Sequence, residues 1–273
     1  MSTIIKFAGA AGVALALSGA ALADGPYARA DVVPVSIFTW TGFYGGVNVG
    51  YGEGGDNVKF AFDPTYFGGA AGIGNVPTQL SADNRGILGG AQIGYNWQFA
   101  PLWVVGVEAD LSWARMNGAA SFTDTNIGLF NTTVERKLDS LGTVRARLGF
   151  LGVPNLLVYG TGGLAYGETG LSVAVTNLAS CALDPGCLSS SNSGVKVGWT
   201  AGAGYELAIG HGISWKTEYL YADLGSRSAT VTSAFGPPGN FYTGTTDFRE
   251  HIVRTGVNFK FGAREELVPV PVK

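Results

Sequence analysis

Residues Arg85–Arg115 read RGILGGAQIGYNWQFAPLWVVGVEADLSWAR, and apolar residues recur at every second position on both sides of Ala100-Pro101. The second apolar set opens with Trp103 and closes with Trp113. Because successive side chains of a strand point to opposite faces, this period of two predicts two strands joined by a tight turn. Each strand is about a dozen residues long, which exceeds a typical soluble strand and suits a tilted strand that crosses a bilayer.

The two faces of this predicted hairpin differ in polarity. One face is apolar and carries aromatic residues at its ends, while the other carries Gln, Asn, Glu and Asp among glycines. A soluble sheet buries its apolar face, whereas a membrane barrel turns its apolar face to lipid and encloses a polar lumen. Long strands, a tight turn and a polar second face together favour a hairpin of an outer-membrane barrel.

Six further stretches show the same alternation, so the chain holds eight predicted strands. The six stretches are Gly42–Tyr51, Glu135–Phe150, Leu156–Val173, 197–207, Ile213–Tyr221 and Phe248–Phe261. Short turns alternate with four long polar connections, which are predicted to be loops at 52–84, 117–133, 177–194 and 222–247. The sequence therefore predicts an all-β fold, an eight-stranded antiparallel up-and-down transmembrane β-barrel with short periplasmic turns and four long extracellular loops. The glycine-rich centre of Leu156–Val173 leaves the two faces of that strand unassigned.

Outward aromatic residues of these strands fall at two levels, as expected for the two interfaces of a membrane. The predicted periplasmic girdle consists of Phe43, Trp97, Phe99, Trp103, Phe150, Tyr205, Trp215, Phe259 and Phe261. The predicted outer girdle consists of Tyr51, Trp113, Trp199 and Tyr221.

Composition agrees with a surface that largely meets lipid. The chain has 273 residues, of which 43 are glycine and 14% are charged. Many glycines lie inside the alternating stretches, where they relieve crowding in a curved sheet or face a narrow lumen. With a net charge of −3 and no basic bias, nucleic acid is not expected as a partner.

The first 23 residues are predicted to be a secretory signal peptide. Lys6 precedes a short apolar run, and Ala21-Leu22-Ala23 is a small-x-small cleavage site, so the mature chain is expected to begin at Asp24. Residues 24–39 are predicted to be a flexible periplasmic linker, 40–261 the barrel and 262–273 a periplasmic tail. Localisation in the bacterial outer membrane follows from this organisation.

Four stretches carry a family likeness: WTGFYGG at 40–46, TGGLAYG at 161–167, WKTEYLY at 215–221 and RTGVNFKF at 254–261. In this order they resemble the small outer-membrane barrels of alphaproteobacteria called the porin family or outer-membrane immunogenic proteins, within the OmpA-like barrel group. The resemblance implies an envelope-structural protein, a surface antigen or a small porin, and some relatives bind haemin. It also implies outer-membrane lipid, lipopolysaccharide and the barrel-assembly machinery as partners, with Phe261 as the assembly signal. The family usually ends at that aromatic, whereas this chain continues through Gly262–Lys273.

Charged residues at inward positions are the strongest candidates for a functional site. They are Glu108, Asp110, Arg145, Arg147, Glu206, Lys216, Glu218 and Arg254, and Asp139 is also predicted to point inward. Eight strands leave an interior just wide enough for side chains, and buried charges must pair or be solvated, so an ion-pair network is favoured over a selectivity ring. Hairpin geometry places Glu108 opposite Arg145 or Arg147 within one step of register. Lys216 and Glu218 are placed to meet Glu206 and Arg254.

The only two cysteines, Cys181 and Cys187, flank Asp184-Pro185-Gly186 in a predicted outer loop. In an oxidising compartment two such cysteines indicate a disulfide bond. A metal site would need more ligands than this loop offers, and no cofactor is predicted.

The leading functional prediction is a structural protein that maintains the envelope and displays loops for an extracellular ligand, with its lumen plugged by ion pairs. The alternatives are a small porin that passes solutes and a surface protein that binds haemin or another host ligand. His211 and His251 lie at opposite ends of the predicted barrel, so they cannot ligate one haem iron. An enzyme is not predicted, because the sequence positions no nucleophile beside either histidine.

Overall fold

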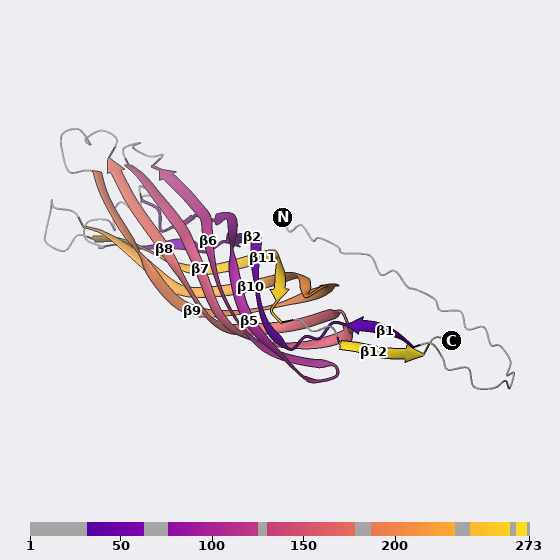
Figure 1. Ribbon diagram of the computed structural model, residues 1–273. Coiled ribbons are helices and arrows are strands. Elements are labelled where there is room, and N and C mark those ends of the chain that lie inside the picture. Colours follow the sequence, from indigo (N-terminus) through magenta and orange to yellow (C-terminus); the bar gives the residue numbers. More distant parts are fainter. Residues whose placement is uncertain are drawn as a thin grey trace, which may run out of the picture. The chain divides into compact units, whose positions relative to one another are not determined.

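The computed structural model describes residues 32–62, 76–124, 130–177, 187–232, 241–262 and 266–271 (Figure 1). The predicted signal peptide and the cleavage site before Asp24 lie outside these residues. Among the described residues, no helix is long and apolar enough to cross a membrane.

Eight antiparallel strands close into a ring, which confirms the predicted fold class. They are β2 (Gly42–Gly54), β5 (Asn84–Ala100), β6 (Trp103–Thr123), β7 (Phe130–Val153), β8 (Leu156–Asn177), β9 (Cys187–Gly210), β10 (Ile213–Thr232) and β11 (Phe241–Lys260). Each strand pairs with the next in this order, and β11 returns to pair with β2. The predicted hairpin at 85–115 is present as β5 and β6, with Trp97 opposite Val105. Closure leaves the ring without an open edge.

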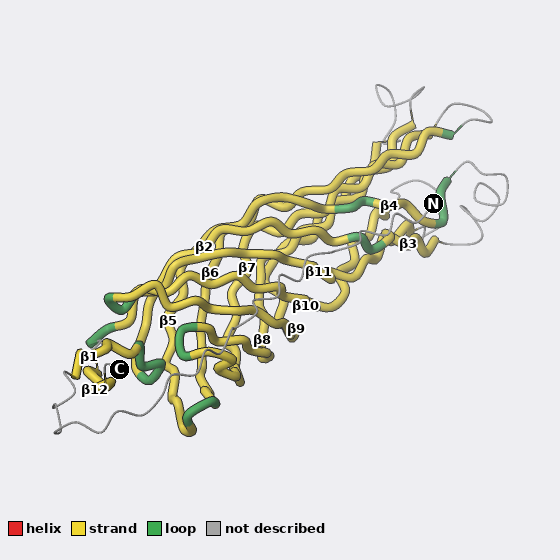
Figure 2. The backbone as a smooth tube through the Cα atoms, turned by 90° about the vertical axis from the view of Figure 1, so that its right-hand side faces the viewer, coloured by secondary structure: helices red, strands yellow, loops and turns green. Residues whose placement is uncertain are grey.

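The four long connections are shorter than predicted, because the strands continue well into them. The first connection also contains β3 (Asn57–Phe62) and β4 (Gln79–Ser81). β3 pairs with β11 and β4 pairs with β3, at the end of the barrel opposite the short turns (Figure 2). The prediction of loops over the whole of 52–84, 117–133, 177–194 and 222–247 is therefore wrong in extent.

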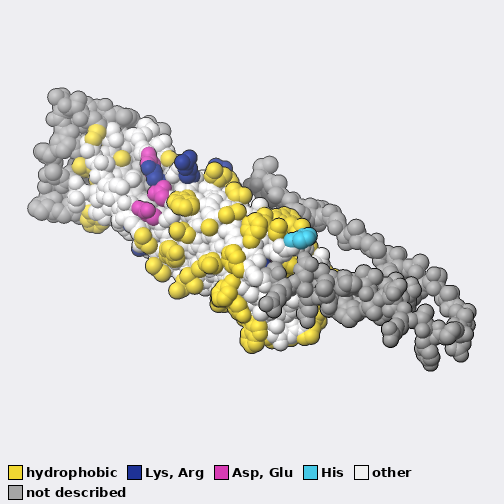
Figure 3. Space-filling model, viewed as in Figure 1, with side chains coloured by type: hydrophobic (Ala, Val, Ile, Leu, Met, Phe, Trp, Pro, Cys, Tyr) yellow, Lys and Arg dark blue, Asp and Glu magenta, His cyan; other side chains and the backbone are white. Residues whose placement is uncertain are grey.

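Outside the ring, exposed aliphatic and aromatic side chains form an apolar band. Trp113 is 74% exposed and Val107 on the same strand is 59% exposed. Figure 3 shows hydrophobic side chains gathered over the barrel, with charged side chains along one border. The apolar band comprises 42–51, 87–99, 103–113, 142–150, 158–166, 197–207, 213–221 and 253–261. The parts of the strands beyond it, toward the long connections, are called the projecting region.

Asp139 corrects one predicted orientation, because its side chain is exposed rather than inward. The register of β7 against β8 shifts between Leu138 and Ser140. An extra residue in one strand reverses the alternation beyond it. Leu138 and Leu141 are consequently both inward and buried, and Asp139 between them faces outward.

Two strands lie outside the barrel sheet. β1 (Val32–Ile37) pairs with β12 (Glu266–Pro271) in a two-stranded sheet of its own. The predicted flexible linker and C-terminal tail therefore each contain a strand.

The interior of the ring is layered rather than polar throughout. An apolar layer at the turn end contains Trp40, Val104, Leu151, Leu157 and Tyr159. A second apolar layer lies near the far border of the band and contains Leu88, Ala114, Met116, Leu138, Leu141, Ala165, Leu220, Ala222, Leu224, Phe248 and Ile252. A third fills the projecting region with Val58, Phe60, Val76, Ala82, Val134, Leu171, Val173, Val175, Ala229, Val231 and Tyr242. The eight charged residues predicted for the lumen lie between the first two layers, and a smaller group of buried polar side chains, Asn84, Arg136 and Glu250, lies beyond the second layer.

Candidate functional site in the barrel lumen

All eight charged residues that the sequence places in the lumen lie in one buried cluster, here called the charged layer. β6 supplies two acids, β7 two arginines, β9 one acid, β10 a lysine and an acid, and β11 one arginine. Each of these side chains belongs to a residue that is 4% exposed or less: Glu108, Asp110, Arg145, Arg147, Glu206, Lys216, Glu218 and Arg254. Four acids face four bases, so the layer carries no net formal charge.

Strand register explains how the charges meet. Glu108 lies directly opposite Arg145 across β6 and β7, and Glu218 lies opposite Arg254 across β10 and β11. Because alternate residues share a face, each inward charge has inward neighbours two positions away. Opposite charges on neighbouring strands thus arrive at the same height in the lumen.

Arg145 links three carboxylates from two sides of the ring. Its Nη2 lies 2.5 Å from Glu108 Oε1 and 3.0 Å from Asp110 Oδ2. Its Nη1 lies 3.1 Å from Glu218 Oε2, which comes from β10 across the lumen. A rigid, planar guanidinium suits such a shared position, because its donors point in fixed directions.

Arg254 makes the matching bridge from β11. Its two terminal nitrogens donate to the two oxygens of Asp110 at 2.8 and 2.9 Å, and its Nε donates to Glu218 Oε1 at 2.7 Å. This bidentate contact with Asp110 fixes both side chains in one plane. Arg145 and Arg254 together tie β6, β7, β10 and β11 across the interior.

Lys216 and Arg147 complete the pairing nearer the turns. Lys216 Nζ lies 2.8 Å from Glu108 Oε1 and 3.2 Å from Glu218 Oε1. It stands opposite Glu206 in register, but Glu206 instead accepts from Arg147 Nη2 at 2.6 Å. Arg147 also lies over the ring of Tyr159, with 4.1 Å between its Cζ and the ring centroid.

Neutral side chains around the charged layer were not assigned a role by the sequence. Tyr44 donates to Glu108 Oε2 at 2.8 Å, and Tyr159 donates to Glu218 Oε2 at 3.1 Å. The alternation of Gly42–Tyr51 places Tyr44 on the inward face, so its position in the lumen could be predicted from the sequence. Tyr159 lies on the strand whose faces the sequence could not assign. The other neutral partners are Asn48, Gln92, Thr143, Ser214 and Asn258.

Two glycines show why small residues line this interior. A Cβ on Gly94 would lie 2.4 Å from the Tyr44 hydroxyl, and a Cβ on Gly46 would lie 2.3 Å from Asn258 Oδ1. Both distances are too short for real carbon atoms, so a side chain at either position would displace a hydrogen-bonded group. Glycine leaves room for the long polar side chains that fill the lumen.

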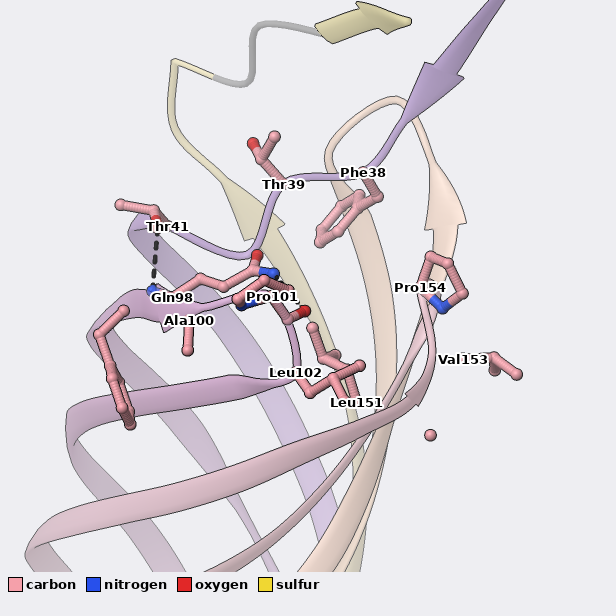
Figure 4. Close-up of a pocket in the computed structure, with 12 residues that line it drawn as sticks. Phe38, Thr39, Thr41, Gln98, Ala100, Pro101, Leu102, Leu151, Val153 and Pro154 are labelled. Atoms are coloured by element: carbon pink, nitrogen blue, oxygen red, sulfur yellow. Dashed lines mark hydrogen bonds between the residues drawn. The ribbon is translucent and has the colours of Figure 1, made fainter. Parts of the chain in front are cut away.

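At the turn end, residues 38–41 fold across the mouth of the barrel. Trp40 is 2% exposed and donates from Nε1 to the carbonyl of Pro154 at 3.1 Å. Thr41 accepts a hydrogen bond from the backbone of Gln98, which Figure 4 shows at the edge of the mouth. Lys260 donates to Thr39 Oγ1 at 2.8 Å. A pocket of about 820 Å³ remains between this segment and the two nearest turns (Figure 4).

A ring of eight strands, an apolar exterior and a charged interior are the features of an outer-membrane barrel. The family model of the outer membrane protein beta-barrel domain matches residues 10–261. The chain belongs to this family. Its short turns accordingly face the periplasm, and its projecting region is extracellular.

Two relatives give the family likeness in sequence. The 31 kDa outer-membrane immunogenic protein of Brucella melitensis biotype 1 is 37% identical over 229 residues, which cover 84% of this chain and 86% of the relative. The 22 kDa outer membrane protein of Rhizobium leguminosarum bv. viciae is 32% identical over 196 residues, which cover 72% and 76%. These relatives confirm the resemblance to the outer-membrane immunogenic proteins and the localisation in the outer membrane.

One solved structure aligns with most of the chain at low sequence identity. The outer membrane protein OprG from Pseudomonas aeruginosa aligns with 82% of this chain and 97% of its own, with a TM-score of 0.45 and 12% identity.

The predicted aromatic girdle faces outward in the structure. Twelve of its members are exposed: Phe43, Tyr51, Trp97, Phe99, Trp103, Trp113, Phe150, Trp199, Tyr205, Trp215, Phe259 and Phe261. Tyr221 is half-buried, because it packs against Trp199 with 5.3 Å between the ring centroids. Other ring contacts join neighbouring strands, such as Trp103 with Phe150 at 5.4 Å.

The remaining predicted site residues are scattered rather than gathered. His211 occupies the β9–β10 turn with a φ of 53°, and His251 is exposed on β11, where its Nδ1 lies 2.6 Å from the Tyr219 hydroxyl. Phe261 is 59% exposed and donates its backbone N–H to the carbonyl of Phe43. Cys187 opens β9, whereas Cys181 lies outside the described residues, so their disulfide stays a prediction.

Proposed function

We propose that this protein is a closed structural barrel that strengthens the outer membrane and displays its outer connections at the cell surface. The charged layer carries this proposal. A water-filled pore would leave its lining side chains exposed, whereas each of these eight is 4% exposed or less. The apolar layers on both sides offer no polar path to either mouth.

The ion pairs make the proposed plug stable as well as tight. Each carboxylate of the layer has at least two donors, and each base has at least one carboxylate within 3.2 Å. Pairing of this kind offsets the cost of removing charges from water only when the geometry is good and further hydrogen bonds are made. Tyr44, Tyr159 and Thr143 supply such bonds.

Single-channel recording on refolded mature protein in planar bilayers tests the plug. We expect no steady conductance from the wild type, and intermittent current from Arg145→Ala, because that substitution removes the guanidinium that spans three carboxylates. Arg249→Ala, which removes an exposed arginine outside the lumen, is the matched control and should stay silent. Reproducible wild-type conductance that Arg145→Ala leaves unchanged would replace this proposal with a small porin.

We propose a non-enzymatic role and no haem ligand from the barrel itself. His251 already contacts Tyr219 on the outer surface of the sheet, and His211 is at the opposite end of its neighbouring strand. A haemin titration should therefore give the same result for wild type and His251→Ala. Equal binding by both would direct the search for an extracellular ligand to the outer connections, whereas a loss in His251→Ala would favour the haemin alternative.

Phe261 is the proposed signal for the barrel-assembly machinery, although the chain continues past it. Its exposed ring closes the periplasmic end of the β11 row of outward residues. Phe261→Ala should slow insertion into vesicles that contain the assembly machinery while leaving unassisted refolding in detergent unchanged. Equal rates in both systems would contradict this assignment.

A further inference from the structure

A border of outward charged residues follows the apolar band on its extracellular side (Figure 3). Seven of the eight strands of the ring contribute to it, all except β9. The members in strand order are Glu53, Arg85, Arg115, Lys137, Glu168, Asp223 and Arg249. Acids and bases are unevenly distributed around the ring. The three neighbouring strands β5, β6 and β7 each contribute a base and no acid to the border.

The three consecutive bases are brought together by strand register. Arg85 on β5 pairs with Asn117 on β6, and Asn117 pairs with Lys137 on β7, so two cations flank one amide in a single row. Arg115 lies opposite Ile87, one step closer to the band. All four polar side chains are exposed. We name this surface the basic patch.

The basic patch is poorly neutralised by acids of its own chain. Glu53 lies opposite Arg85 across β2 and β5, but among the described residues neither Arg85 nor Arg115 has a carboxylate within 4.0 Å. Lys137 has one such contact, Glu135 at 3.5 Å, in which both side chains are about half exposed. Ion pairs that exposed contribute little and compete poorly with an incoming anion.

Arg249 provides the contrast on the other side of the same border. Its guanidinium lies 3.0 Å from Asp247, 3.3 Å from Asp56 and 3.6 Å from Asp223. Three carboxylates thus surround one exposed arginine. Arg249 is therefore neutralised by its neighbours, whereas Arg85 and Arg115 have no carboxylate within 4.0 Å among the described residues.

Directly below the basic patch lie two strongly exposed apolar side chains, Trp113 at 74% and Ile87 at 64%. A ligand that suits this surface has anionic groups at headgroup level and hydrocarbon below them. Arginine recognises phosphate through paired, charge-assisted hydrogen bonds, and basic clusters beside a membrane attract anionic headgroups. We infer that Arg85, Arg115 and Lys137 bind the phosphates of an outer-leaflet glycolipid, whose acyl chains lie along Ile87 and Trp113. This site rests on the membrane placement of the barrel and is independent of the plug.

Native mass spectrometry of refolded protein in detergent tests the site with two probes, bisphosphorylated lipid A and the same lipid with both phosphates removed. The test variant is Arg85→Gln/Arg115→Gln/Lys137→Gln, and Arg249→Gln is the matched control. Wild type and control should prefer the phosphorylated lipid at least about tenfold. The triple variant should lose about fivefold in affinity per removed cation, or roughly a hundredfold in all.

Inorganic phosphate at millimolar concentration should not displace the lipid, because it lacks the hydrocarbon contact. The gel-mobility shift on heating checks that each variant is folded, and the three single variants replace the triple variant if it does not fold. Equal affinity of wild type and triple variant would overturn the inference. Equal affinity for the two lipids, an equal loss in Arg249→Gln, or displacement by phosphate alone would overturn it as well.

Discussion

The apolar band and the projecting region are built from the same strands with opposite polarity. On β8 within the band, Val158 and Leu164 point outward and are exposed, while Tyr159 points inward to the charged layer. Further along the same strand, Leu171 and Val173 point inward and are fully buried. The outward positions there carry small or hydroxyl side chains instead, such as Ser172, Ala174 and Thr176. On β8 the alternation continues without change while the medium outside changes from lipid to water.

The comparison shows that the barrel has two kinds of interior, a charged layer within the apolar band and an apolar core within the projecting region. In the band, lipid contributes nothing to sealing the lumen, and paired charges fill it. In the projecting region, water surrounds the sheet, and an apolar core forms as in a soluble protein. Stability of the band should therefore depend on ion-pair geometry, and stability of the projecting region on burial of apolar surface.

The largest expected effect comes from breaking the charged layer. Arg145→Ala leaves Glu108, Asp110 and Glu218 with one donor fewer in a dry interior, and should lower the free energy of unfolding by about 3–5 kcal/mol. Urea-induced unfolding in phospholipid vesicles, followed by tryptophan fluorescence, measures it. The matched variant Arg249→Ala removes an arginine with three carboxylate partners at the surface, and should cost about 0–1 kcal/mol. Similar losses in both variants would show that the charged layer is hydrated rather than dry.

A charge placed on the outer face tests where the surrounding medium changes. Val107→Arg puts a cation in the middle of the apolar band and should cost about 2–4 kcal/mol. Ser121→Arg changes an exposed residue on the same face of β6 in the projecting region, and should stay within about 0.5 kcal/mol. The same unfolding experiment compares the two. Equal costs would mean that the band extends farther along β6 than its exposed side chains indicate.

The difference in polarity between the apolar band and the projecting region explains which strands the sequence predicts. The hairpin at 85–115 was predicted because an apolar outer face with aromatic ends is typical of a strand in lipid. The polarity is reversed at 117–123 and 224–232, and polar outward residues of this kind resemble a loop when a strand in lipid is expected. The sequence does not predict β3, because its outward residues are mostly polar. Val58 and Phe60 nevertheless point inward at alternate positions.

The charged layer could be predicted in part. Inward alternation identifies all eight charges, and the hairpin register places Glu108 opposite Arg145 or Arg147, of which the structure has Arg145. Contacts across the lumen, such as Arg145 with Glu218, depend on barrel curvature and side-chain length, which no local pattern encodes. The sequence places Trp40 at the start of the barrel, before the first predicted strand at Gly42, and its role in covering the mouth depends on Pro154, far along the chain.

Glu250 tests the boundary between the two regions. It lies in the projecting region on β11, fully buried, and accepts a hydrogen bond from Asn84 while its Oε2 has no partner among the described residues. Burial raises the pKa of Glu250 to about 7, against the opposing effects of Asn84 and Arg136. A carboxyl with a raised pKa contributes stability that is fully present below its unfolded pKa and is lost as the pH rises through 7.

The barrel should therefore lose up to about 3 kcal/mol of stability between pH 4.5 and pH 7 through this group alone. Glu250→Gln should flatten the pH dependence over that interval in urea titrations. Glu53→Gln, which changes an exposed carboxylate at the neighbouring level, should leave the slope as in the wild type. An unchanged slope in Glu250→Gln would mean that water or a cation reaches the unpaired oxygen.

The smallest effect is expected from the predicted disulfide bond between Cys181 and Cys187. A disulfide between Cys181 and Cys187 closes a short ring and should stabilise by about 2 kcal/mol at most, because little chain entropy is removed. Cys187 is the first residue of β9 and pairs with Thr176, so the bond would anchor the connection to the rim of the projecting region. Alkylation of unreduced protein should find no free thiol by mass. The double variant Cys181→Ser/Cys187→Ser should keep the gel-mobility shift of the closed ring, since that ring is held by backbone pairing along its whole length. If this variant failed to form a heat-modifiable barrel, the outer connections would be part of the folding core, and the division into band and projecting region would have to include them.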